Sequence, residues 1–112
     1  MATNTLKDVG VFVLTNSIVT IYTVPNDRNF TVSMMQLCNT SGNHVTLNLC
    51  VVPPGQAHSQ TYAVLWDFTM AANDALRLLQ GDIWKEGSKL TAVAGTGGVL
   101  NLRLSGVESK VV

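Results

Sequence analysis

The fold is decided by residues 30–52, which read FTVSMMQLCNTSGNHVTLNLCVV. Apolar side chains alternate with other residues on both sides of a polar turn at residues 39–43. A period of two indicates half-buried β-strands, and a cluster of Asn, Ser and Gly between two such runs is typical of a β-hairpin. We therefore predict two paired antiparallel strands here, with Cys38 facing inward and Cys50 facing outward.

Similar short runs recur on both sides of this stretch and are separated by turns such as Pro25–Asn29 and Pro53–Gly55. Residues 75–79 also have helix formers after a capping Asp74, but Gly81 follows too soon for a convincing helix, and we predict a strand. Gly95–Gly98 predicts a hairpin turn. About eight short strands without a long helix predict an all-β protein, an antiparallel, jelly-roll-like β-sandwich. The predicted strands are residues 9–14, 18–24, 30–38, 45–52, 62–70, 75–79, 89–95 and 99–108.

The length and composition indicate one domain that associates with other copies. The 112 residues predict a single domain over 9–108, with a flexible N-terminal arm at 1–8 and a C-terminal tail at 109–112. Charged residues make up 12% of the chain, about half of the usual ~25%, and the net charge is zero. A surface with so little charge favours association, so we expect a homo-oligomer. A neutral chain has no basic stripe for phosphates, which disfavours a nucleic-acid partner.

No stretch approaches the ~18 continuous apolar residues of a membrane-spanning helix, and no secretory-signal pattern is present. We therefore expect no membrane partner and synthesis in a reducing cytoplasm. The predicted parity and register keep Cys38 and Cys50 apart, which predicts free thiols. His44 and His58 lack the spacing of a metal motif and are predicted to be solvated loop residues. We predict no metal site and no cofactor.

Catalytic patterns are weak in this sequence. The glycine-rich turn at residues 95–98 lacks the Lys-Ser/Thr and the helix of a phosphate-binding loop, and no G-x-S-x-G elbow occurs. A glycosidase would need two carboxylates at a set separation, whereas the candidates are scattered, and we predict surface and turn-capping roles for them. We predict no catalytic residues and no enzymatic activity, and a small hydrolase is the least favoured function. The carboxylates considered are Asp67, Asp74, Asp82 and Glu86.

Large aromatic side chains are the remaining candidates for function. On alternating strands they indicate core or interface anchors more often than a sugar-binding shelf. The candidate interface residues are Phe12, Tyr22, Tyr62, Trp66 and Trp84.

An ordered series of short motifs resembles a recurring small β-domain of tailed-bacteriophage virion proteins, over roughly residues 18–108. Two features depart from this pattern, because Pro25–Arg28 lacks a Pro-Ala-Gly type of turn and Ile83–Glu86 has no counterpart. These domains are structural, so the resemblance implies no catalytic residues. The series comprises YTVP at 22–25, LCNTS at 37–41, VVP at 51–53, ANDALRL at 72–78, LTAVA at 90–94 and LSGVE at 104–108.

The resemblance and the low charge predict a non-enzymatic virion structural protein, most of all a capsid decoration or cement protein. Such a protein would bind the shell and stabilise it as a homo-oligomer, with the two termini as possible clamps. Its expected location is the virion, assembled in the host cytoplasm, with capsid-shell or tail proteins as partners. The alternative is a tail, neck or fibre-associated module that is structural or binds carbohydrate.

Overall fold

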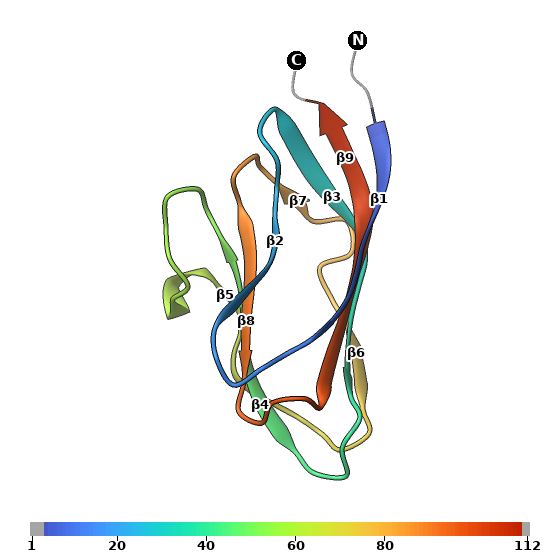
Figure 1. The fold of residues 1–112 in the computed structure, drawn as a ribbon, viewed down its shortest axis with the longest axis vertical. Helices are drawn as coiled ribbons and strands as arrows, with labels where there is room; N and C mark the ends of the chain where they lie inside the picture. Colours follow the sequence, from blue (N-terminus) through green and yellow to red (C-terminus); the bar gives the residue numbers. More distant parts are fainter. Residues whose placement is uncertain (1–3, 111–112) are drawn as a thin grey trace.

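Two antiparallel β-sheets pack face to face in the computed structural model, which describes residues 4–110 (Figure 1). The first sheet has the order β1-β9-β3-β6, and β7 also pairs with β3. The second sheet has the order β2-β8-β4-β5. The first sheet comprises β1 (Asn4–Val13), β9 (Leu100–Lys110), β3 (Arg28–Asn39), β6 (Ala75–Arg77) and β7 (Ile83–Trp84). The second comprises β2 (Val19–Thr23), β8 (Lys89–Ala94), β4 (Val45–Val52) and β5 (Ala63–Met70), with one short 3-10 helix, η1 (Gln60–Tyr62).

The strand order is that of a jelly roll. Both β6 and β7 pair with β3 and together act as one interrupted strand, so the nine strands amount to eight. The first strand then lies beside the last, and most connections cross from one sheet to the other, as in a doubled Greek key. The predicted all-β antiparallel sandwich is therefore confirmed.

The predicted hairpin at residues 30–52 is wrong, because β3 and β4 belong to different sheets. The intervening turn is a corner of the sandwich, and the buried Asn39 holds it. The Asn39 side-chain amide donates to the carbonyl oxygens of Asn43, Met70 and Ala71 at 2.8, 3.3 and 3.1 Å. Gly95–Gly98 is likewise a corner, because β8 and β9 lie in opposite sheets.

The predicted inward direction of Cys38 is wrong because of a bulge, whereas Cys50 faces outward as predicted but is covered by a loop. The register of β3 shifts between Val32 and Met34, so the side chains beyond it change faces, and Cys38 points outward and is half-buried. Cys50 does point away from the core, but it is fully buried under the segment 53–62. Both thiols are free.

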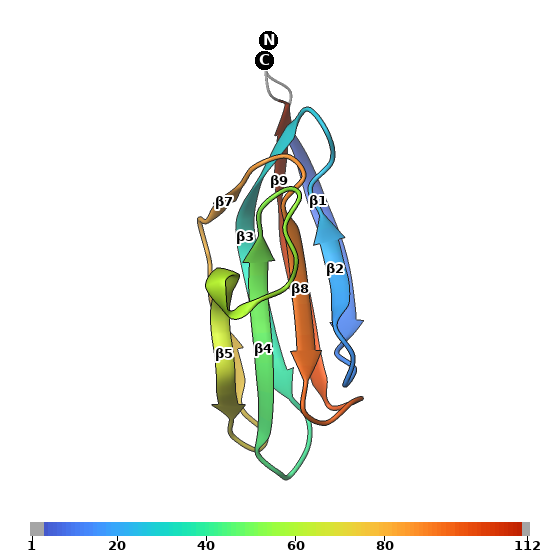
Figure 2. The ribbon, with the colours of Figure 1, turned by 90° about the vertical axis from the view of Figure 1, so that its left-hand side faces the viewer.

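The ends of the domain differ from the predicted arm and tail. β1 begins at Asn4 and pairs with β9, so residues 4–8 belong to the sheet. β9 extends to Lys110, two residues past the predicted boundary. Residues 1–3 and 111–112 of the predicted arm and tail lie outside the described part of the chain. The two ends of the described chain lie together at one end of the sandwich (Figures 1 and 2).

The core is formed by the inward-facing residues of both sheets. Near the termini it contains an aromatic cluster, in which the ring centroids of Tyr22 and Phe30 are 4.8 Å apart and those of Phe30 and Trp84 are 5.4 Å apart. Gly106 makes room for this cluster, because a Cβ there would collide with the Thr31 carbonyl oxygen and lie 2.5 Å from Phe30 Cζ. The largest fully buried side chains are Phe30, Leu14, Met35, Leu37, Leu49, Met70, Leu90, Leu100, Leu102, Leu104, Val24 and Val32.

Candidate functional site

The five aromatic residues predicted as interface candidates do not form one surface. Trp84 and Tyr22 are buried in the core, and Phe12 packs against it while half-buried. Tyr62 in η1 and Trp66 on β5 are half-buried and belong to the side of the other sheet. Trp66 lies 5.8 Å from the ring of His58, measured between centroids. The aromatic side chains therefore serve mainly to pack this protomer, and a shelf for sugar stacking is not assembled from them.

The segment 53–62 folds over the outer face of the second sheet, as Figure 2 shows. His58 anchors it, because its Nδ1 atom lies 2.7 Å from the Thr91 hydroxyl on β8. The Cys50 thiol on β4 donates to the Ser59 carbonyl oxygen at 3.3 Å, and its sulfur lies 3.9 Å from His58 Nε2. His58 is thus half-buried in a polar cluster, and its prediction as a solvated loop residue is wrong. His44 is exposed.

A thiol, an imidazole and an orienting hydroxyl are the parts of a cysteine nucleophile site. The environment does not activate them. Burial raises the pKa of the Cys50 thiol and lowers the pKa of His58, so both groups stay neutral near pH 7. The Cys50 side chain is also 0% exposed, so no substrate reaches its sulfur. The arrangement anchors the segment 53–62 to the sheet.

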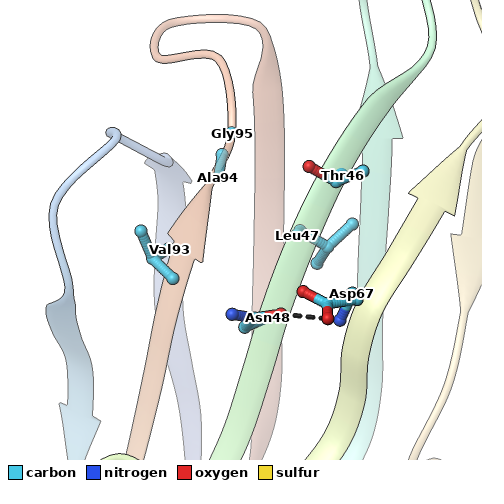
Figure 3. Close-up of a pocket in the computed structure, with 7 residues that line it drawn as sticks. All are labelled: Thr46, Leu47, Asn48, Asp67, Val93, Ala94 and Gly95. Carbon is cyan, nitrogen blue, oxygen red and sulfur yellow. Dashed lines mark hydrogen bonds between the residues drawn. The ribbon is translucent and has the colours of Figure 1, made fainter.

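A shallow hollow of about 160 Å³ lies further along the same outer face (Figure 3). Its polar wall joins β4 to a bulge in β5, where Asp67 has a φ of +49° and its backbone N–H donates to Asn48 Oδ1 at 2.7 Å. Asp67 is the only carboxylate in its lining, so it lacks the acid–base pair that hydrolysis of a glycoside requires. The hollow can offer hydrogen bonds to a polar molecule. It is lined by Thr46, Leu47, Asn48, Asp67, Val93, Ala94 and Gly95.

The other three carboxylates considered in the sequence each accept a hydrogen bond from a neighbouring group. Asp82 accepts from the Trp84 indole N–H at 2.8 Å, and Asp74 accepts from the Ala75 N–H at 2.8 Å. Glu86 accepts from the N–H of Asp27, a residue with a positive φ, at 2.7 Å. All three residues are exposed, as predicted, and Asp74 and Glu86 accept their hydrogen bonds from backbone N–H groups. Within residues 5–110, no three His, Cys, Asp or Glu side chains gather as a metal-ion site.

The outer face of the first sheet has a row of side chains that the sequence did not reveal. In the strand register, Leu6 on β1 opposes Val107 on β9, Val107 opposes Thr31 on β3, and Thr31 opposes Ile83 on β7. The side chain of Leu6 is 86% exposed and that of Ile83 is 65% exposed. We call these four residues the apolar row. They are far apart in the chain, so only the register of four strands brings them together.

The two outer faces differ in character. Among residues 5–110, six large apolar side chains are exposed, and four of them lie on the outer face of the first sheet: Leu6, Val11, Val13 and Ile83. The second sheet instead presents threonine and asparagine side chains and is partly covered by the segment 53–62. The first sheet therefore presents most of the exposed large apolar side chains of the described residues.

No protein-family model and no curated protein matches this sequence. None of the described residues forms a helix that is long and apolar enough to cross a lipid bilayer. Two solved structures share the fold. One comes from the Bacillus endospore appendages, reported as a novel family of disulfide-linked pili, with a TM-score of 0.58 and 12% identity over 100% of this chain and 91% of that one. The other comes from the T13 IBDV viral particle, with a TM-score of 0.55 and 11% identity over 98% of this chain and 31% of that longer one. At such identities the likeness establishes a shared β-sandwich architecture, found in one protein of an appendage and one of a viral particle.

Proposed function

We propose that this protein is a non-enzymatic structural protein of a bacteriophage virion, which decorates the capsid shell and stabilises it by associating with other copies and with the shell. The observation that carries this proposal is the jelly-roll strand order combined with a sheet face that presents large apolar side chains to solvent. A domain of this kind acts through its surfaces, by burying apolar area against a neighbour.

The chemistry of the described residues agrees with a surface-based role. Cys50 is fully buried beside the half-buried His58, and burial shifts the pKa of each group toward its neutral form. The hollow beside Asp67 contains a single carboxylate. The low fraction of charged residues favours association over a solitary state. The motifs shared with small virion β-domains support a place in a phage particle, and the fold shared with a protein of the IBDV particle supports a viral setting.

A second candidate is the subunit of a filamentous appendage or of a tail or fibre. The likeness to the appendage protein favours it, because the two chains match over nearly their whole lengths, whereas this chain matches 31% of the IBDV chain. In this role the protein would repeat along an axis instead of covering a shell. A carbohydrate-binding module is less favoured, since Trp84 and Tyr22 are buried.

Locating the protein in assembled material tests the proposal. Phage particles from cells that produce the protein would be purified and imaged by electron microscopy with labelled antibodies against it, beside particles from cells that lack its gene. We expect label on the capsid shell and particles that lose their DNA at a lower temperature when the protein is missing. Label confined to the tail or to separate filaments would support the second candidate, and purified particles without label would contradict both.

A further inference from the structure

We propose that the outer face of the first sheet is the self-association interface, and that two copies stack there about a two-fold axis parallel to the strands. This inference rests on the proposed function, because it names the surface through which the copies would associate. The occupant of the face is a second copy of this chain.

The size of the face suits a stable dimer. β3 and β9 have 12 and 11 residues, and the molecule measures 18 Å across the strands. At ~3.3 Å per residue the face covers roughly 700 Å², close to the ~800 Å² that each partner buries in a standard interface. The exposed apolar side chains on it are the kind of surface that marks a protein contact.

The edge of the same sheet is a poorer contact. β1 is an edge strand, but Lys7 and Asp8 lie in its middle and a register shift between Asp8 and Gly10 follows them. Charged residues and bulges are the means by which proteins prevent edge-to-edge pairing. Stacking through the face is therefore favoured over extension of the sheet.

The apolar row makes the face self-complementary. A two-fold axis parallel to the strands places β1 of one copy over β7 of the other and β9 over β3. Leu6 and Ile83 stand at opposite ends of one row, so each Leu6 meets the Ile83 of the second copy. The two central residues of the row, Val107 and Thr31, face each other in the same way.

Asp8 and Arg77 on this face are complementary about the same axis, whereas the third outward-facing charged side chain of the paired strands, Arg103 on β9, faces Gln36 of the second copy. In the strand register, Asp8 on β1 is level with Ser105 and Met34. Arg77 on β6 is level with Gln36, the next residue of β3 after Met34 whose side chain faces outward. Stacking brings each Asp8 close to the Arg77 of the second copy, and opposite charges that lose solvent together favour the matching orientation.

A hollow of about 390 Å³ completes the fit. It lies on this face, where the bulges of β1 and β3 flank β9, and its lining includes the small residues Ser33, Ser105 and Gly106. Because β9 of one copy faces β3 of the other, Met34 of the second copy lies over Ser105 and can fill the hollow. Met is the side chain best suited to an irregular space.

Sedimentation velocity of the full chain over a wide concentration range tests the interface. We expect the wild type to dimerise and both Leu6→Glu and Ile83→Glu to raise the dissociation constant more than about tenfold, since each would bury an unpaired charge. Ile18→Glu is the matched control, because Ile18 is 58% exposed but lies outside the first sheet, and we expect no change from it. All of these positions are exposed, so folding should persist, and circular dichroism would verify this.

Two further variants test the axis. Asp8→Arg and Arg77→Asp should each weaken the dimer, and the double variant should restore it. In a Cys38→Ser background, Leu6→Cys combined with Ile83→Cys should give a disulfide-linked dimer in air, whereas Leu6→Cys alone should not. A linked dimer from Leu6→Cys alone, or no rescue by the charge swap, would overturn this axis.

The same measurements distinguish a wrong interface from a wrong proposed function. A wild type that associates while Leu6→Glu and Ile83→Glu associate equally well would overturn the face and leave self-association standing. A wild type that remains monomeric at every concentration would overturn the self-association in the proposed function, and the face with it.

Discussion

Tyr22 on β2 donates a hydrogen bond to the carboxylate of Glu108 on β9, and this bond joins the two sheets at the end of the sandwich near the termini. Both side chains are buried, although Glu108 is an acidic residue on an otherwise apolar inward face. A buried carboxylate is costly unless a donor satisfies it, and the phenol supplies that donor. The pair therefore fixes how the sheets meet at this end.

Replacing Tyr22 with Phe should destabilise the protein by about 1–3 kcal/mol, because it leaves the buried Glu108 carboxylate without this partner. Urea unfolding followed by circular dichroism would measure the loss. Tyr62→Phe is the control, since Tyr62 is only half-buried and its hydroxyl forms no hydrogen bond with another residue of the described part of the chain. Equal stability losses in the two variants would contradict the role of the pair.

The stability of the protein should fall at alkaline pH because of the same residue. Burial, followed by the hydrogen bond to Glu108, raises the pKa of Tyr22 well above its usual value of about 10. The neutral phenol is thus favoured in the folded state, and its contribution is complete below pH ~10 and is lost as the pH rises toward the higher folded-state pKa. Urea unfolding at a series of pH values should show the gap between wild type and Tyr22→Phe narrowing above pH ~10. A gap that stays constant or widens there would contradict this prediction.

Gly106→Ala should destabilise the protein by about 3 kcal/mol, the upper part of the range for overpacked cores. The added methyl group would lie 2.5 Å from Phe30 Cζ and collide with the Thr31 carbonyl oxygen, and backbone cannot move as a flexible side chain can. Gly42→Ala is the matched control, because nothing lies within 4 Å of a Cβ there and the position is exposed. Chemical denaturation of both variants would decide, and a similar small loss in each would count against the close packing of β9 on Phe30.

The period of two in the sequence was enough to predict most of the strands and the two-layer architecture. It could not predict strand partners, because alternation shows which face of a strand is buried and not which strand lies beside it. The corner at Asn39 illustrates this. Its side-chain amide donates hydrogen bonds to the carbonyl oxygens of Met70 and Ala71, which are far along the chain, and these contacts hold the corner where the chain leaves β3 for the other sheet. Cys38 shows a second limit, because one extra residue at the bulge reverses every later side chain.

The apolar row was missed for the same reason. The sequence predicts Leu6 in a flexible arm and Ile83 in a segment that departs from the resembled family, and no local pattern connects the two residues. Residue type alone predicts aromatic side chains as interface candidates, yet Tyr22 and Trp84 fill the core. An unusually low fraction of charged residues was the only signal in the sequence that pointed to an exposed apolar face.

Acidic pH should release the segment 53–62 from the second sheet. Burial lowers the pKa of His58, so the folded state favours the neutral ring bound to Thr91. The stabilisation is therefore complete above the unfolded-state pKa of about 6.5 and is lost as the pH falls through the lower folded-state value. Protonation should expose Cys50, which the segment covers. The rate at which 4,4′-dithiodipyridine, a reagent active at acidic pH, labels Cys50 relative to the half-exposed Cys38 should rise several-fold below pH ~6.

The controls for this labelling experiment come from the two histidines. His58→Gln should remove most of the pH dependence, because the amide has no proton to gain in this range. His44→Gln should retain it, since His44 is exposed and lies at the opposite end of β4 from the segment. Cys38 reports any general opening of the fold, so an increase in its own rate at the same pH would indicate unfolding of the sandwich instead. A constant ratio of the two labelling rates in the wild type, through acidic pH, would show that His58 does not control the segment. A rise confined to Cys50 and abolished by His58→Gln would make the contact between His58 and Thr91 the anchor on which the covering of Cys50 depends.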